Sequence, residues 1–176
     1  MADLEVIAEG TVTAASLEIT SIDQSYQHLS LETNFADTGT GSRAYVFQVY
    51  INGITSWDYG YQRIILQNGS AIAATGTGLS GYVSSQCGYI VGNYSGSQPN
   101  QRSAVQMYFP GYSNTDFNKT WFVSSNSQDY TTGDQDTWSV GTGGVNTDAA
   151  ITSVKLAGNS GSNITGNYCL YGWKSA

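Results

Sequence analysis

Charged side chains are scarce in this sequence. They make up 11% of its 176 residues, less than half of the roughly 25% that is typical of globular domains. The formal net charge is −7, and the six Lys and Arg residues are scattered singly along the chain. Because nucleic-acid affinity comes mainly from clustered Lys and Arg, the composition argues against a nucleic-acid partner.

Histidine and cysteine are nearly absent, with only His28, Cys87 and Cys169. One imidazole excludes metal sites built from several histidines. Neither cysteine lies near a second one at metal-ligand spacing, and the sequence contains no nucleophile-elbow or phosphate-loop motif. We therefore expect no cofactor and no nucleophilic catalysis. We expect two free buried thiols, with a disulfide between them as the alternative.

Long apolar runs are missing too. No uninterrupted stretch approaches the about 20 residues that span a bilayer, so we expect no membrane insertion. Asp3, Glu5 and Glu9 stand where a signal peptide would carry basic residues before an apolar run. The sequence therefore predicts a protein made in the cytoplasm.

The acidic residues suggest two kinds of site, a glycosidase active site and a calcium site, and each has a simpler interpretation. A glycosidase needs two carboxylates that face each other across a cleft, which sequence spacing cannot establish, so we predict no enzyme. Asp129, Asp134 and Asp136 lie within one stretch, DYTTGDQD, and clustered carboxylates can bind Ca²⁺. Because their spacing does not match the calcium loop Asp-x-Asp-x-Asp-Gly, we interpret them as an acidic turn and keep them as weak metal candidates.

Alternating polar and apolar residues are the main structural signal, and they are clearest from Ser16 to Phe35. In the second arm of this segment Leu29, Leu31 and Phe35 fall on one side of a period-two pattern, while polar residues fall on the other. The polar Asp23-Gln24-Ser25 between the two arms is typical of a turn. The pattern predicts an antiparallel hairpin with one buried face, which needs a second layer to cover it.

Short segments of this kind, separated by Gly-rich turns, recur along the chain. We expect about eleven of them, with strong turn signals at Asn52-Gly53 and Pro110-Gly111. No segment shows helical periodicity over the about 11 residues that a helix prediction needs, and no repeat of fixed period occurs. The sequence therefore predicts an all-β fold, a two-sheet β-sandwich of jelly-roll type with short antiparallel strands, in which residues 1–176 form a single domain.

Aromatic residues are abundant, with thirteen Tyr and four Trp. A Tyr side chain offers a large contact area with a polar tip and loses little rotamer entropy on binding. Several aromatic residues stand at alternate positions, where they could face the core, form a subunit interface or stack on sugar rings. The candidates for an interface or a glycan-binding surface are Trp57, Tyr59, Tyr61, Tyr108 and Tyr112.

The two ends of the chain carry a family likeness. The opening ASLEITSIDQSYQHLSLETNF has the order Ile-x-x-Ile, turn, Tyr-x-His-Leu-x-Leu, and the closing AITSVKLAGNSGSNITGNYCLYGW has a strand, a Gly/Ser/Asn turn and a Leu-Tyr-Gly strand. Both segments resemble small β-rich virion proteins of tailed bacteriophages, especially phages of cyanobacteria and marine bacteria. Where those proteins often carry Arg-rich strands after the Leu-x-Leu segment, this chain has Glu32, Asn34 and Asp37.

The resemblance implies a non-enzymatic structural protein of the virion, made in the host cytoplasm. Members of this group include capsid decoration or cement proteins and tail-fibre or receptor-binding domains. We expect a decoration, cement or knob protein on the particle surface, which forms a homotrimer and contacts the major capsid protein or tail subunits. The alternative is a tail-fibre or tailspike module that binds a host receptor or a host surface glycan.

Overall fold

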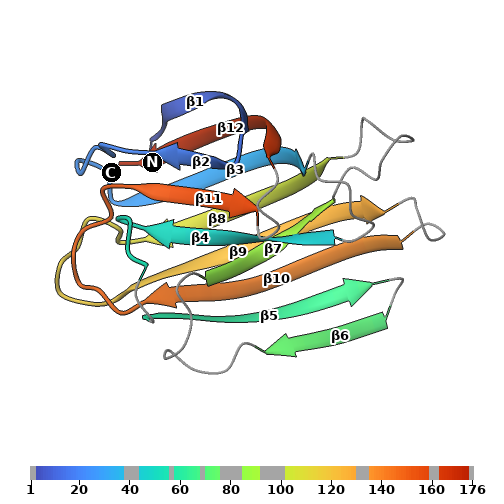
Figure 1. The fold of residues 1–176 in the computed structure, drawn as a ribbon. Helices are drawn as coiled ribbons and strands as arrows, with labels where there is room; N and C mark the ends of the chain where they lie inside the picture. The colour runs from blue at the N-terminus through green and yellow to red at the C-terminus, as the bar shows by residue number, and fades with distance from the viewer. Residues whose placement is uncertain are drawn as a thin grey trace.

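Twelve β-strands in two sheets make up the described part of the chain in this computed structural model (Figure 1). The structure describes residues 3–37, 44–55, 58–67, 70–75, 85–91, 102–129, 135–158 and 163–174. No helix long and apolar enough to cross a membrane occurs in these ranges. The expectation of an all-β fold with two antiparallel sheets is confirmed.

The larger sheet has eight strands in the order β1-β12-β3-β8-β9-β10-β5-β6, and every neighbouring pair is antiparallel. In that order the strands are β1 (Leu4–Ala14), β12 (Ile164–Trp173), β3 (His28–Asp37), β8 (Ser103–Pro110), β9 (Lys119–Asp129), β10 (Gln135–Val145), β5 (Tyr59–Gln67) and β6 (Ser70–Thr75).

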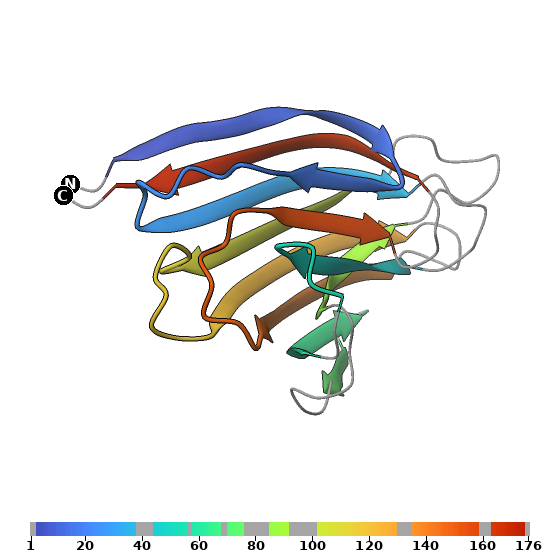
Figure 2. The ribbon, with the colours of Figure 1, turned by 60° about the vertical axis from the view of Figure 1, so that its left-hand side comes forward.

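The smaller sheet has four strands in the order β2-β11-β4-β7, again all antiparallel. It lies across one face of the larger sheet (Figure 2). Its strands are β2 (Ser16–Ile19), β11 (Val154–Gly158), β4 (Ala44–Ile51) and β7 (Ser85–Val91).

Four of the strand pairs are nested in the sequence. The outermost pair is β1 with β12, followed inward by β2 with β11, β3 with β8, and β4 with β7. Successive pairs alternate between the larger and the smaller sheet. The remaining strands form two further antiparallel pairs, β5 with β6 and β9 with β10, which both extend the larger sheet beyond β8.

The predicted hairpin between Ser16 and Phe35 is wrong, because its two arms belong to different sheets. β2 pairs with β11, whereas β3 pairs with β12 and β8. The connection between the arms is a corner that crosses between the sheets: Ile22 is buried there, and its backbone N–H donates to the Thr152 carbonyl at 3.1 Å. Period-two alternation identifies the buried face of a strand but not the strand beside it.

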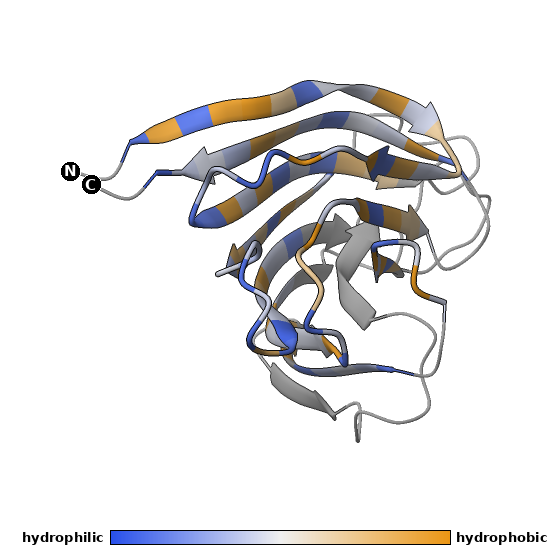
Figure 3. Cartoon of the chain, turned by 90° about the vertical axis from the view of Figure 1, so that its left-hand side faces the viewer, coloured by the Kyte–Doolittle hydropathy of each residue, from blue (hydrophilic) through white to orange (hydrophobic). Residues whose placement is uncertain are grey.

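The core lies between the two sheets and follows the alternation that the sequence predicts. Leu29, Leu31 and Phe35 of β3 are fully buried, as expected. Hydrophobic and hydrophilic residues alternate along β3 (Figure 3). The core also contains two aromatic side chains from the middle of the larger sheet, Phe109 of β8 and Trp121 of β9, whose ring centroids lie 6.0 Å apart.

Both predicted turns are present at the ends of strands. Asn52 and Gly53 have φ angles of 52° and 66°, the left-handed region that Asn and Gly tolerate best, and the Ile54 N–H donates to the Ile51 carbonyl at 2.9 Å. β8 ends at Pro110, and Gly111 follows with a φ of 54°. The Asn52 turn does not close a hairpin, because β4 and β5 lie in different sheets.

Candidate functional site

The outer face of the larger sheet, which points away from the smaller sheet, gathers most of the exposed apolar side chains. Six large hydrophobic residues are exposed among the described residues, and five of them stand on this face. The sixth, Phe117, lies between β8 and β9. The five residues on the outer face are Leu4, Val6, Ile64, Phe122 and Trp138.

Strand register divides this face into an apolar end and an amide-rich end. At the apolar end Phe122 of β9 lies opposite Tyr108 of β8, and Tyr171 of β12 lies opposite Val6 of β1. His28 lies beside Tyr108, with ring centroids 5.6 Å apart. Exposed apolar patches of this kind mark interaction surfaces. We call this group, together with Leu4, the apolar end.

The amide-rich end is organised around Trp138 of β10, which is 42% exposed. Its partner across the ladder is Asn126 of β9, whose own partner is Ala104 of β8. The neighbouring row on the same face contains Ser124 of β9, Gln106 of β8 and Glu32 of β3. The Asn126 amide therefore stands beside the indole ring, and hydroxyl, amide and carboxylate groups follow it across the next strands.

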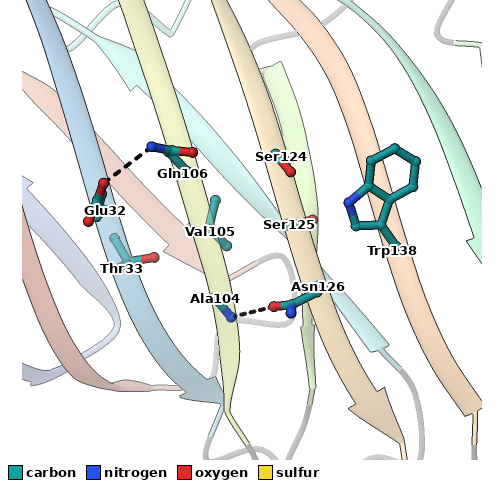
Figure 4. Close-up of a pocket in the computed structure, with 9 residues that line it drawn as sticks. All are labelled: Glu32, Thr33, Ala104, Val105, Gln106, Ser124, Ser125, Asn126 and Trp138. Atoms are coloured by element: carbon teal, nitrogen blue, oxygen red, sulfur yellow. Dashed lines mark hydrogen bonds between the residues drawn. The ribbon is translucent and has the colours of Figure 1, made fainter.

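A shallow depression of about 370 Å³ lies among these residues (Figure 4). The indole of Trp138 stands at one side of it, and Glu32 and Gln106 stand at the other. Gln106 Nε2 donates to Glu32 Oε1 at 3.2 Å, and the Ala104 N–H donates to Asn126 Oδ1 at 3.3 Å. These two bonds orient the polar side chains across the floor of the depression.

Two of the predicted surface aromatics, Tyr59 and Tyr112, are core residues, which corrects their assignment to an interface or a glycan surface. Both side chains are 0% exposed. The hydroxyl of Tyr59 accepts the Ile51 N–H at 2.8 Å and donates to the Ile54 carbonyl at 3.1 Å. Burial raises the pKa of Tyr59 to about 12. The hydroxyl of Tyr112 donates to the Asp23 carbonyl, which ties the loop after β8 to the corner after β2.

The other three aromatic candidates have different positions. Tyr61 is half-buried on the same side of β5 as Tyr59, so it faces inward. Tyr108 is half-buried on the outer face, where burial raises the pKa of its hydroxyl. Trp57 lies outside the described residues. Of the four candidates that the structure describes, only Tyr108 lies on the outer face.

Sequence reasoning missed Phe122 and Trp138 as surface residues. The signal for Phe122 was present but weak: its neighbours at two-residue spacing are polar, whereas Trp121 beside it alternates with Val123. An aromatic residue on the polar side of a strand is a candidate for a contact with something outside the chain. Trp138 gives a weaker signal, because Val140 stands on the same side of β10.

The three predicted metal candidates stand at or between the ends of β9 and β10 in the sequence. Asp129 ends β9, Asp136 stands near the start of β10, and Asp134 falls between these strands. The side chains of all three lie outside the described part of the structure. Within that part, no group of three or more His, Cys, Asp or Glu residues could hold a metal ion.

The two cysteines belong to strands of different sheets. Cys169 of β12 is a free thiol on the outer face, at the position opposite Glu32, and it is half-buried. Cys87 belongs to β7 of the smaller sheet, and its side chain lies outside the described residues. The thiol of Cys169 also raises the pKa of the Tyr171 hydroxyl, to about 12, through a side-chain hydrogen bond.

Lys119 is a buried cation that sequence reasoning did not predict. The residue is 1% exposed, on the inner side of β9. Its ammonium donates to the carbonyls of Phe117 and Asp148 at 2.7 and 3.1 Å and lies 5.2 Å from the Phe117 ring centroid. Burial lowers the pKa of this ammonium. Because its partners are backbone carbonyls of two loops, Lys119 fastens these loops together at the start of β9.

Comparisons of this chain with protein-family models, with curated proteins and with solved structures gave no match.

Proposed function

We propose that this chain is a non-enzymatic structural protein of a phage virion, a decoration, cement or knob protein that attaches through the outer face of its larger sheet. The observation that carries the proposal is the concentration of exposed apolar side chains on that one face. A neighbouring subunit that covers the apolar end would bury Val6, Phe122 and the aromatic residues between them. The low charge of the chain suits such a contact, because interface centres are poor in charged residues.

The nested strand pairs support the finer fold assignment, an eight-stranded jelly roll. A jelly roll is an antiparallel ribbon wrapped so that successive pairs alternate between two sheets, and it is found in viral capsid proteins and lectins. The four nested pairs of this chain follow that order. In this assignment the pairs β5–β6 and β9–β10 are insertions that widen one sheet. They bring Ile64, Phe122 and Trp138 to the outer face.

Self-association as a homotrimer and contact with the major capsid protein or tail subunits belong to the same proposal. β1 is an edge strand of the larger sheet, and it carries Leu4 and Val6 at the apolar end. A neighbour seated on this end would cover the strand edge as well as the apolar side chains. In a closed three-fold assembly, a neighbouring copy would cover the β1 edge of each subunit.

A second candidate function is a receptor-binding or glycan-binding module of the tail. The specific observation in its favour is the depression beside the exposed Trp138, which lies at the opposite end of the outer face from Leu4 and Val6. The two candidates use different residues, so they can be tested separately.

The attachment proposal is tested with purified protein and phage particles from the genome that encodes it. We expect the wild-type protein to form a trimer in solution by light scattering and to co-migrate with particles that lack their own copy. Phe122→Ser should abolish co-migration, because it removes the largest exposed side chain of the apolar end.

The matched control for this experiment is Ile64→Ser, which changes a similarly exposed apolar residue at a distance from the apolar end. This variant should co-migrate like the wild type. A wild-type protein that does not associate with particles would remove the attachment proposal and leave the second candidate.

A further inference from the structure

We propose that the amide-rich end of the outer face binds a neutral oligosaccharide, with one sugar ring stacked on Trp138 and its neighbours bonded to Asn126, Gln106 and Glu32. The proposal rests on the second candidate function above and names its site and ligand class. It does not depend on where the chain is attached, because none of these residues belongs to the apolar end.

The indole of Trp138 supplies the stacking surface. The residue is 42% exposed, and its ring stands at the side of the depression (Figure 4). The face of an aromatic ring carries partial negative charge, which attracts the weakly positive C–H groups on one face of a pyranose. An exposed indole at the side of a polar depression therefore suits a sugar ring better than it suits an apolar side chain.

The polar side chains are held in position before any ligand arrives. Asn126 Oδ1 accepts the Ala104 N–H, which leaves the two N–H donors of the Asn126 amide for a ligand hydroxyl. Gln106 Nε2 donates to Glu32 Oε1, which leaves Gln106 Oε1 and the second carboxylate oxygen as acceptors. A sugar hydroxyl both donates and accepts, so this alternation of donors and acceptors matches a polyhydroxyl ligand. Preorganised groups of this kind lower the entropic cost of binding.

The length of the site favours an oligosaccharide over a single sugar. Trp138 stands on β10 and Glu32 on β3, with β9 and β8 between them. Three strand spacings correspond to about 14 Å, which is longer than one pyranose ring. The depression is also open and shallow along this line, so a chain of sugars can lie across the strands.

Charge selects among the possible sugars. Glu32 lines the depression, and no Lys or Arg is among the described residues that line it. The whole chain carries a net charge of −7. Sulfated, sialylated or uronic-acid sugars would therefore meet repulsion, whereas neutral sugars would not.

The test is calorimetric titration of the purified full chain with two sets of oligosaccharides. One set contains neutral gluco-, manno- and galacto-oligosaccharides, and the other contains oligogalacturonates and sulfated galactans. We expect binding to at least one neutral oligosaccharide and none to the anionic set. Trp138→Ala should weaken this binding by about tenfold or more, since it removes the stacking contact, and Trp138→Phe should retain part of it.

Two further variants separate this proposal from the attachment proposal. Gln106→Ala should also weaken the titrated binding, because it removes a polar group of the depression and releases Glu32. Phe122→Ser should bind the sugar like the wild type, although it fails to co-migrate with particles. The proposal is overturned if no neutral oligosaccharide binds, or if Trp138→Ala, shown to be folded by its unfolding transition, binds as tightly as the wild type.

Discussion

The two faces of the larger sheet are built from the same strands, but the inner face is buried and the outer face is exposed. On β9, Trp121 points inward and is 1% exposed, whereas Phe122 points outward and is 55% exposed. The inner ring packs against Phe109 and, with centroids 6.4 Å apart, against Tyr59. The difference shows that the parity of their positions places one of two adjacent aromatic residues in the core and leaves the other exposed.

Polar groups follow the same division. On the inner face the hydroxyls of Ser125 and Ser139 are buried and share a 2.7 Å hydrogen bond. On the outer face Gln106 and Glu32 are also paired, but they are exposed and keep bonding capacity for a partner. Buried polar groups need a partner within the chain, whereas exposed ones can exchange water for a ligand.

Truncation of the two adjacent aromatic residues of β9 tests the difference between the inner and the outer face most strongly. Trp121→Ala should lower the free energy of unfolding by about 3 to 5 kcal/mol, because it leaves a large cavity in the core. Phe122→Ala should change it by about 0.5 kcal/mol or less, because its ring is exposed. Urea titrations followed by circular dichroism measure both values. Equal losses for the two variants would contradict the assignment of the faces.

Lys119→Met tests whether the buried cation on the inner face holds its two loops together. The variant keeps the apolar stem but leaves the carbonyls of Phe117 and Asp148 without their donor, so we expect a loss of about 1 to 3 kcal/mol. The same urea titration applies, and Lys155→Met, at a half-buried position in the smaller sheet, is the control. A Lys119→Met protein as stable as wild type would mean that the ammonium bonds add nothing to the fold.

The pH dependence of stability distinguishes a buried tyrosine, such as Tyr59, from an exposed one. The folded-state pKa of Tyr59 is raised to about 12 from the ordinary value of 10.0. The folded protein therefore keeps the hydroxyl proton where the unfolded chain has lost it, and stability is complete below pH 10 and falls as the pH rises toward 12. Tyr59→Phe should show a smaller fall over this window, although it is less stable at pH 8 because it loses the bonds to Ile51 and Ile54.

Unfolding free energies measured at intervals from pH 8 to about 12 give the stability at pH 8 and its fall at alkaline pH, for the wild type and for Tyr59→Phe. Some fall should remain in Tyr59→Phe, because the pKa values of Tyr108 and Tyr112 are also raised by burial. An unchanged slope in the variant would show that Tyr59 does not contribute to alkaline unfolding.

The smallest effect is expected on the outer face. Trp138→Ala and Ile64→Ser should each leave the free energy of unfolding within about 0.5 kcal/mol of wild type, because both residues stand on the surface, where they are 42% and 52% exposed. Thermal unfolding followed by fluorescence of the remaining tryptophans would detect a larger change. A substantial loss of stability in either variant would place that residue in the core and remove it from the binding surface.

The sequence predicted the strands and their buried faces better than it predicted their neighbours. The alternation in β3 identified Leu29, Leu31 and Phe35 as core residues, and all three are buried. The same pattern could not show that β2 pairs with β11, more than a hundred residues away in the chain. Long-range pairing depends on how the two sheets pack, which alternation within a single segment does not report.

The candidate site was harder to predict than the fold. A Tyr at an alternate position is compatible with either face, and Tyr59 and Tyr112 proved to be buried with their hydroxyls bonded to backbone carbonyls. The Tyr112 bond joins segments 89 residues apart, and the alternation along a strand reports neither bond. Trp138 became a candidate only when the register placed Asn126 beside it.

The central claim is that the inner face of the larger sheet forms the core, whereas the outer face binds a partner on the particle. Hydroxyl-radical oxidation, read residue by residue by mass spectrometry, tests it on the free protein and on protein bound to phage particles. We predict that Phe122 is oxidised in the free protein and protected on the particle, while Trp121 is protected in both. Equal oxidation of Phe122 in the free and the particle-bound protein would contradict the claim.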